Sequence, residues 1–135
     1  MSGPSPRPSR RSSIGWSSVR RRLVRHHADP LGHLVGLLSG ARPRFRDGCF
    51  VYVSDRGLSR RILSRRGYAA ITFGHVIVSA QEPPPALLRH ERRHVAQYER
   101  LGLAFLPLYL RLYRRHGYAA HPLERDAAEV ARLFS

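Results

Sequence analysis

The sequence predicts a small α+β fold in which a short three-strand sheet precedes a helical half. Two observations carry this prediction. Runs rich in β-branched and aromatic residues lie within residues 49–79, and such runs are typical of strands. Residues 86–101 contain no glycine or proline and are followed by a glycine, as expected of a helix with a C-terminal stop. With 135 residues, 42% of them hydrophobic, the chain can form one domain but not two comfortable ones.

The N-terminal part divides into a tail and a helical segment. Residues 1–18 consist largely of Ser, Pro, Arg and Gly, and we expect them to be disordered. Residues 19–135 are expected to form the single domain. Within it, the apolar positions between Val19 and Leu38 fit one or two short helices, with a break near Asp29–Pro30.

Three segments make up the predicted sheet. Cys49–Val53 is β-branched and aromatic, which indicates a strand. Tyr68–Phe73 and Val76–Ser79 indicate two strands around a tight turn, or one long kinked strand. Between these segments, Asp55–Arg66 is polar and dense in arginine, which fits either a loop or a short exposed helix.

Three helices are expected in the second half. Pro83–Pro85 end the sheet region and preset the first turn of a helix over Ala86–Leu101. A second helix is expected over Phe105–Arg115 and a third over Leu123–Phe134, with a loop over Tyr118–Pro122 between them.

The large positive net charge of the chain is only weak evidence for nucleic-acid binding. The formal net charge is +15, and all 24 basic residues are arginine. A surface selected for phosphate contacts normally uses lysine as well. An arginine-only chain rich in Ala, Gly, Pro and Leu instead indicates GC-rich codon usage, so we do not expect nucleic acid to be the main partner. The alternative of a basic nucleic-acid or membrane-surface binding module stays open, with the N-terminal arginines or residues 103–115 as the contact.

Other classes of protein are disfavoured by composition. The single cysteine, Cys49, rules out a disulfide framework and a cysteine-based zinc finger. The longest apolar stretch, Leu101–Leu110, is interrupted by Gly102 and Pro107 and falls far short of the ~20 residues of a membrane span. No segment has the pattern of a secretory signal, so the expected location is cytoplasmic.

The chemically informative motif is HExxH, at residues 90–94 (HERRH). Two histidines at i and i+4 on a helix lie one turn apart on one face, so both rings can reach one Zn²⁺ ion. Glu91 then lies beside the metal and accepts a proton from water whose pKa the ion lowers. The predicted helix buries the face that carries His90 and His94. The alternative interpretation is a surface helix with two incidental histidines.

A catalytic zinc site needs a third protein ligand and an open fourth position. Glu124 is the best candidate because it falls in the first turn of the last helix, which can present it to an antiparallel neighbour. Its alternative role is that of an acid favoured by the helix dipole. The other downstream candidates are His116, His121, Asp126 and Glu129.

These residues resemble a known family. Residues 90–102 (HERRHVAQYERLG) are similar to the HExxHxxQ helix of small bacterial zincin-like metallopeptidases, many described only as domains of unknown function. Residues 70–77 (AITFGHVI) look like a strand segment of the same proteins, and Glu124 in PLERDA is similar to the third zinc ligand of gluzincins, including minigluzincins. The resemblance covers a metal-binding half at about residues 68–129. It implies that His90, His94 and Glu124 bind zinc, and that Glu91 is the general base and acid in hydrolysis of a peptide or protein substrate.

The sequence also departs from the family pattern. Arg92 and Arg93 occupy positions that are usually uncharged, and Arg93 is close enough to His90 to repel a dication. Ala128 stands where many gluzincins carry an aspartate that orients a histidine. That role would fall to Asp126 or to a backbone carbonyl.

Three roles stay open at this point. Gln97 either hydrogen-bonds within the site or only packs against it. The zinc is either catalytic or purely structural, clamping two helices together. The side chains that qualify by type as an oxyanion stabiliser are Tyr109, Tyr113, Tyr118, His116 and His121.

Overall fold

The computed structural model describes residues 25–133. The expected tail over residues 1–18, the apolar positions between residues 19 and 24 and the expected end of the last helix at Phe134 lie outside these residues. The described strands are β1 (Arg44–Arg46), β2 (Cys49–Val53), β3 (Ala70–Phe73) and β4 (Val76–Ser79). The helices are α2 (Asp29–Leu38), α3 (Gly57–Arg66), α4 (Pro85–Leu101), the 3₁₀ turn η1 (Gly102–Ala104), α5 (Phe105–His116) and α6 (Pro122–Leu133).

The α+β class is confirmed, but the prediction of three strands is wrong, because the sheet has four in the order β1-β2-β4-β3. Strands β1 and β2 are antiparallel, β2 and β4 are parallel, and β3 and β4 are antiparallel. The additional strand β1 is three exposed residues long. It pairs with β2 through a tight turn in which Asp47 and Gly48 both have positive φ, 50° and 83°, a geometry that Asp-Gly favours.

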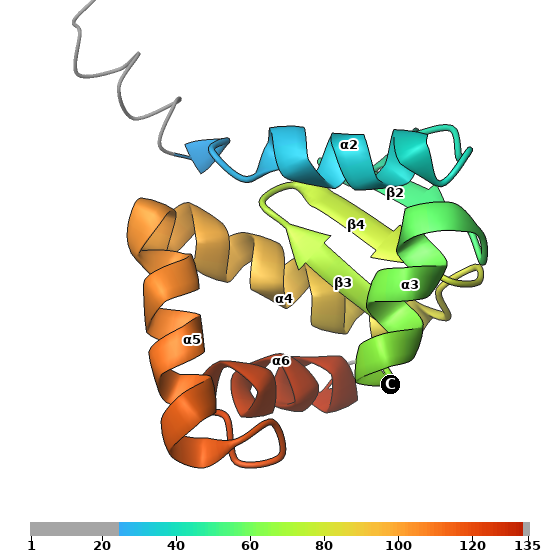
Figure 1. Ribbon diagram of the computed structural model, residues 1–135. Helices are drawn as coiled ribbons and strands as arrows, with labels where there is room; N and C mark the ends of the chain where they lie inside the picture. The colour runs from blue at the N-terminus through green and yellow to red at the C-terminus, as the bar shows by residue number, and fades with distance from the viewer. Residues whose placement is uncertain (1–24, 134–135) are drawn as a thin grey trace, which may run out of the picture.

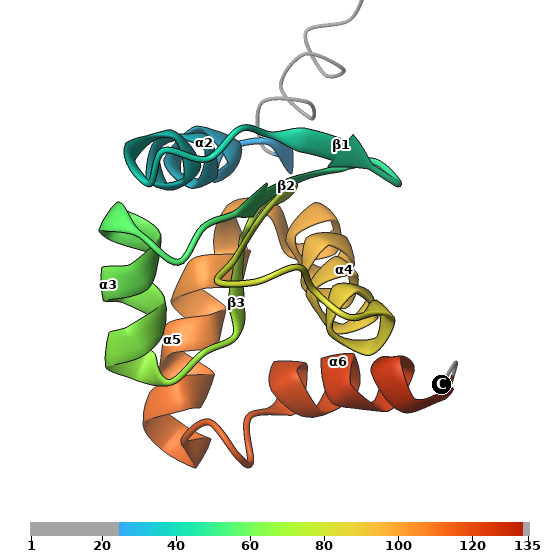
Figure 2. The ribbon, with the colours of Figure 1, turned by 90° about the vertical axis from the view of Figure 1, so that its right-hand side faces the viewer.

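Helices cover both faces of the sheet (Figures 1 and 2). Figure 2 shows the sheet almost edge-on, with α3 on one side and α4 on the other. One buried cluster, centred on Tyr52, Val76 and Val78, joins the sheet to α2 and α3. The other, which contains Val51 and Ile77, packs against Val95 of α4. Figure 1 shows α6 running along α4, on the side away from the sheet.

Helix α2 begins at Asp29–Pro30, where the sequence predicted a break, because a proline is tolerated in the first turn of a helix. Its packing face consists of Gly32, Val35 and Gly36. A Cβ atom on Gly36 would lie 2.3 Å from the ring of Tyr52, and one on Gly32 would lie 2.5 Å from Cβ of Val76. The two glycines therefore let the helix lie directly on the sheet.

The helical half agrees closely with the predicted bounds. Helix α4 ends at Leu101, just before Gly102 with φ of 55°, and α5 ends at His116, just before Gly117 with φ of 67°. The segment Asp55–Arg66, for which a loop and a short helix were both open, contains the helix α3 with Ser59 and Leu63 buried. Among residues 25–133 no helix combines the length and the apolar character needed to cross a bilayer.

Candidate metal centre

The structure brings His90, His94 and Glu124 together, although Glu124 is 30 residues further along the chain than His94. The Nε2 atoms of the two histidines lie 3.2 Å apart. Oε2 of Glu124 lies 3.2 Å from Nε2 of His90 and 3.3 Å from Nε2 of His94. The three side chains offer one ligand atom each and form a group that could hold a metal ion.

Helices α4 and α6 produce this convergence. His90 and His94 occupy successive turns of α4, and Glu124 lies in the first turn of α6, directly after Pro122 begins that helix. The helices run antiparallel, because early residues of α4 contact late residues of α6. The guanidinium of Arg89 donates to the carbonyl of Ala131, whereas the amide of Gln97 donates to the carbonyl of Leu123.

The spacing of the three donor atoms fits a single tetrahedral ion. Bonds of about 2.0–2.1 Å at tetrahedral angles place neighbouring ligand atoms about 3.3 Å apart. The three observed separations, 3.2, 3.2 and 3.3 Å, agree with this value. Two imidazole nitrogens and one carboxylate oxygen also form a donor set that suits zinc and related transition metals.

Gln97 determines which nitrogen of His94 is available as a ligand. The side-chain nitrogen of Gln97 donates to the carbonyl of Leu123 at 3.0 Å and to Asp126 at 2.8 Å. Its oxygen consequently faces Nδ1 of His94, at 2.9 Å. Because that oxygen can only accept, Nδ1 carries a hydrogen and donates it, which leaves the lone pair of Nε2 for a metal. Gln97 thus hydrogen-bonds within the site and connects Asp126 to His94.

The positive charge of Arg93, which was expected to repel a dication, is balanced by the carboxylate of Asp126. Nε and Nη2 of Arg93 donate to the two carboxylate oxygens of Asp126, at 2.7 and 3.1 Å. These hydrogen bonds lower the pKa of Asp126 and raise that of Arg93. Arg92 does not pair with Asp126: its Nη1 lies 3.5 Å from Oδ2 of Asp47 in the β1–β2 turn.

Tyr109 orients the carboxylate of Glu124. Its hydroxyl donates to Oε1 at 2.6 Å, so that Oε2 faces the two histidines. Burial disfavours the ionised form of Glu124, but its interactions with the imidazoles of His90 and His94 outweigh burial and hold its pKa well below the ordinary range. Glu124 is therefore a carboxylate, as a metal ligand must be. Burial likewise opposes the charge on His94, but Glu124 outweighs it and raises the pKa of His94.

Glu91 lies on the same helix as the histidines and is almost completely buried, with 4% of its surface exposed. Its Oε2 accepts a hydrogen bond of 2.7 Å from the hydroxyl of Thr72 on β3. Burial raises the pKa of Glu91, while the neighbouring His94 and the Thr72 hydroxyl oppose that effect. Glu91 is therefore a buried carboxyl group held beside the three donor atoms without being one of them.

These four side chains line one cavity of about 520 Å³. The remaining walls are mainly apolar and aromatic, and come from β3, α4, α5 and the start of α2. Such a volume and lining are typical of a binding pocket with a few convergent polar groups.

The other sequence candidates occupy different places. His121 is fully buried and connects two segments: its Nε2 lies 3.0 Å from the carbonyl of Tyr109, and the amide of Leu123 donates to its Nδ1. His116 and Glu129 are exposed on α5 and α6. Of the oxyanion candidates, Tyr109 and Tyr118 both line the cavity. Tyr109 donates its hydroxyl hydrogen to Glu124, and Tyr118, with 45% of its surface exposed, also interacts with Glu124. Burial raises the pKa of Tyr118 to about 12, so its hydroxyl is a donor.

The supporting roles of two residues, Thr72 and Tyr109, were not identified from sequence. Thr72 was noted only as part of a strand, although alternation along β3 places it on the same face as Ala70, toward α4. The contact of Tyr109 with Glu124 had no signal in the sequence, because it depends on the angle between α5 and α6.

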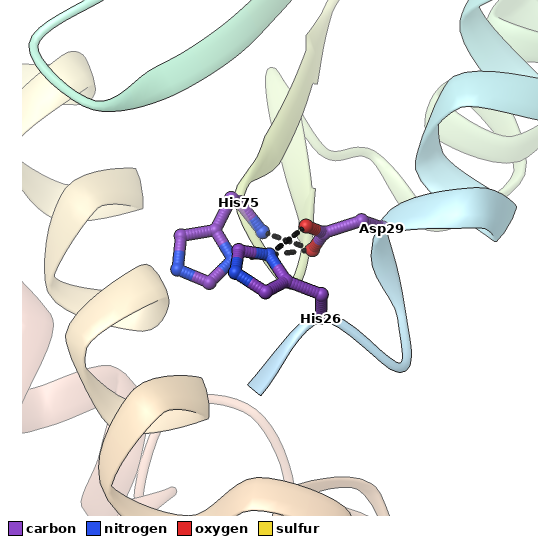
Figure 3. A group of neighbouring side chains, drawn as sticks. All are labelled: His26, Asp29 and His75. Carbon is purple, nitrogen blue, oxygen red and sulfur yellow. Dashed lines mark hydrogen bonds and ion pairs between the residues drawn. The ribbon is translucent and has the colours of Figure 1, made fainter. Parts of the chain in front are cut away.

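A second group of potential ligands, His26, Asp29 and His75, also lies within the described residues (Figure 3). Oδ1 of Asp29 accepts the backbone N–H of His75 at 2.7 Å, and its Oδ2 lies 2.5 Å from Nδ1 of His26. Nε2 of His75 lies 3.0 Å from Glu99 of α4. The 2.5 Å contact is that of a hydrogen bond and is shorter than the ~3.3 Å between two ligands of one zinc. We call this group the clasp, because it ties the start of α2 to the β3–β4 turn.

Comparisons with protein-family models, curated proteins and solved structures found no match to this chain.

Proposed function

We propose that this chain is a small zinc-dependent peptidase of the gluzincin type, with His90, His94 and Glu124 as metal ligands and Glu91 as general base and acid. The observation that carries the proposal is the placement of three donor atoms 3.2–3.3 Å apart, with a buried carboxyl group beside them in one cavity. The resemblance of residues 68–129 to zincin-like proteins supports the same assignment.

The ligand set favours a catalytic ion over a purely structural one. Closed structural zinc sites use four protein ligands, whereas catalytic sites use three and leave one position open. The described residues supply three, and these face the cavity. Bound zinc supplies a Lewis acid, which polarises a carbonyl group and lowers the pKa of water to about 7.

The chain's own residues have separate tasks in this scheme. Gln97 holds His94 in the tautomer that presents Nε2, and Tyr109 holds Glu124 with Oε2 toward the histidines. Thr72 holds Oε2 of Glu91, which leaves Oε1 to take the proton from attacking water and deliver it to the departing amine. Tyr118, which lines the cavity beside Glu124, is the hydroxyl donor we assign to the developing oxyanion.

A peptide is the substrate class that suits the surroundings. Strand β3 lies at the edge of the sheet, and all four of its residues line the cavity. The outer edge of such a strand offers backbone N–H and C=O groups to an extended peptide. The apolar cavity walls provide room for its side chains.

The test separates metal binding from catalysis. The purified full-length chain is loaded with zinc and freed of excess metal, and its zinc content and its hydrolysis of a quenched-fluorescence peptide library are measured. We expect Glu91→Gln to retain zinc and to lose hydrolysis by about 10²–10⁴-fold. Glu129→Gln, the same change at an exposed position of α6, should leave both unchanged. Failure to hold zinc, or full activity of Glu91→Gln, would refute the proposal.

A further inference from the structure

Leucines of two helices lie at the opening of the cavity instead of in the core. Leu31 of α2 and Leu106 and Leu110 of α5 all line the cavity. Each is nevertheless 48–50% exposed. Side chains that both line a cavity and remain half exposed lie at its mouth, so α2 and α5 form two sides of the opening.

Each helix extends this apolar surface away from the mouth. On α2, Leu34 and Leu38 follow Leu31 at i+3 and i+7, the spacing of one helix face, and are 51% and 60% exposed. On the other side, Leu103 of η1 precedes Leu106 by three residues and is 59% exposed. We call these six residues, Leu31, Leu34, Leu38, Leu103, Leu106 and Leu110, the leucine rim.

The leucine rim is not needed to attach its helices to the protein. Helix α2 packs on the sheet through its glycine face, and the clasp holds its first turn. Helix α5 contributes Phe105 to the interior, where its ring stacks on Tyr98 with centroids 3.7 Å apart. Helix α2 and the η1–α5 segment nevertheless each present three leucines that are 48–60% exposed. Exposed apolar surfaces on soluble proteins mark interaction sites.

Arginines adjoin the leucine rim on α5. Arg111, Arg114 and Arg115 line a shallow hollow together with Pro107 and Leu110. Within residues 25–133, none of these three arginines has a carboxylate within the 4.0 Å of an ion pair. A helix that presents leucines beside cationic side chains has the character of helices that lie in the interface of an anionic membrane.

We propose that the leucine rim docks on an anionic lipid bilayer, so that the mouth of the cavity faces the membrane surface. The leucines enter the boundary between headgroups and acyl chains, while the arginines of α5 contact lipid phosphates. A second copy of the chain fits this surface poorly, because docking would bring together two chains of formal charge +15 and their α5 arginines. Membrane docking by the leucine rim does not depend on whether the metal centre is catalytic.

The primary test is flotation of the full-length chain with vesicles. We expect binding to vesicles of phosphatidylcholine with phosphatidylglycerol and little binding to phosphatidylcholine alone. The double variant Leu34→Ser, Leu103→Ser should lower the partition coefficient about tenfold or more. Leu133→Ser, at a leucine of α6 that is 70% exposed and does not line the cavity, should bind like the wild type. All variants retain the N-terminal arginines, so a difference between them reports on the leucine rim.

A second measurement identifies the docked face directly. An environment-sensitive fluorophore is attached to the introduced thiol of Leu34→Cys or Leu133→Cys, since the native Cys49 is buried. Vesicles should shift the emission of the label at position 34 to shorter wavelength and leave the label at position 133 unchanged. Binding that the serine substitutions do not alter, or emission that does not change at position 34, would overturn the proposal. So would a dimer, detected by light scattering, that the same substitutions dissociate.

Discussion

At the scale of single residues, Gln97 is the side chain that fixes the tautomer of His94. It lies 2.9 Å from Nδ1 of His94 and is itself held by the carbonyl of Leu123 and by Asp126. Leucine has a similar volume but cannot accept a hydrogen bond. We expect Gln97→Leu to weaken zinc binding by about 10–100-fold, the usual effect of losing a partner of a ligating histidine.

Competition with a chelating dye measures this affinity. Gln81→Leu, the same substitution at an exposed position, is the matched control and should bind zinc as tightly as the wild type. A zinc affinity of Gln97→Leu equal to that of the wild type would mean that Gln97 packs in the site without orienting His94.

The convergence of the three candidate ligands was predictable from sequence, whereas their supporting contacts were not. The i, i+4 spacing within one helix places His90 and His94 together whatever the rest of the fold does. Glu124 could be selected because Pro122 marks the start of its helix. The contacts of Gln97 and Tyr109 depend on how α4, α5 and α6 are placed in space. For the same reason the concern about Arg93 was unfounded, since Asp126 on another helix neutralises it.

At the scale of elements, α2 packs on the sheet through glycine, and this close contact predicts the effect of adding a methyl group. A Cβ on Gly36 would lie 2.3 Å from the ring of Tyr52, which is itself only 1% exposed and cannot withdraw. Gly36→Ala gains helix propensity but overpacks the core. We expect a net loss of about 1–3 kcal/mol in the free energy of unfolding, measured by urea denaturation.

A substitution on the exposed face of α2 is the control for Gly36→Ala. Leu34→Ala should change the free energy of unfolding by no more than about 0.5 kcal/mol, because Leu34 is half exposed. If Gly36→Ala were as stable as the wild type, α2 would have to lie further from the sheet than described. This result would also weaken the argument that α2 is attached without its leucines.

Helices and strands were predicted well where the sequence signal for them lies within a few neighbouring residues. Strand β2 and the helical half were placed closely because composition and glycine stops act within a few residues. Strand β1 was missed because Arg44–Arg46 is too short to show a strand pattern, although the Asp47-Gly48 pair after it is a signal for a hairpin turn. The pattern of α2 indicated a helix but not its buried face, which is chosen by the fit of Gly32 and Gly36 to the sheet.

At the scale of the whole molecule, the contact between α4 and α6 does not depend on a metal ion alone. Arg93 pairs with Asp126, and Gln97 bonds to Leu123 and Asp126, close to His94 and Glu124 along the two helices. Near the C-terminal end of α4, Glu99 and the clasp join that helix to the β3–β4 turn and α2. The protein is therefore expected to stay folded without metal, with the ligands already close together.

This expectation separates a catalytic ion from a structural clamp on which folding depends. Chelation should leave the far-ultraviolet circular dichroism at 25 °C unchanged. Zinc at about a hundred times its dissociation constant should stabilise the fold by about 2.7 kcal/mol and raise the melting midpoint by about 10 °C. His94→Ala should melt at the same temperature with and without zinc, and saturation should occur at one ion per chain, because the clasp is held by hydrogen bonds. Unfolding on chelation would favour a structural zinc, and a second ion lost in His26→Ala would make the clasp a metal site.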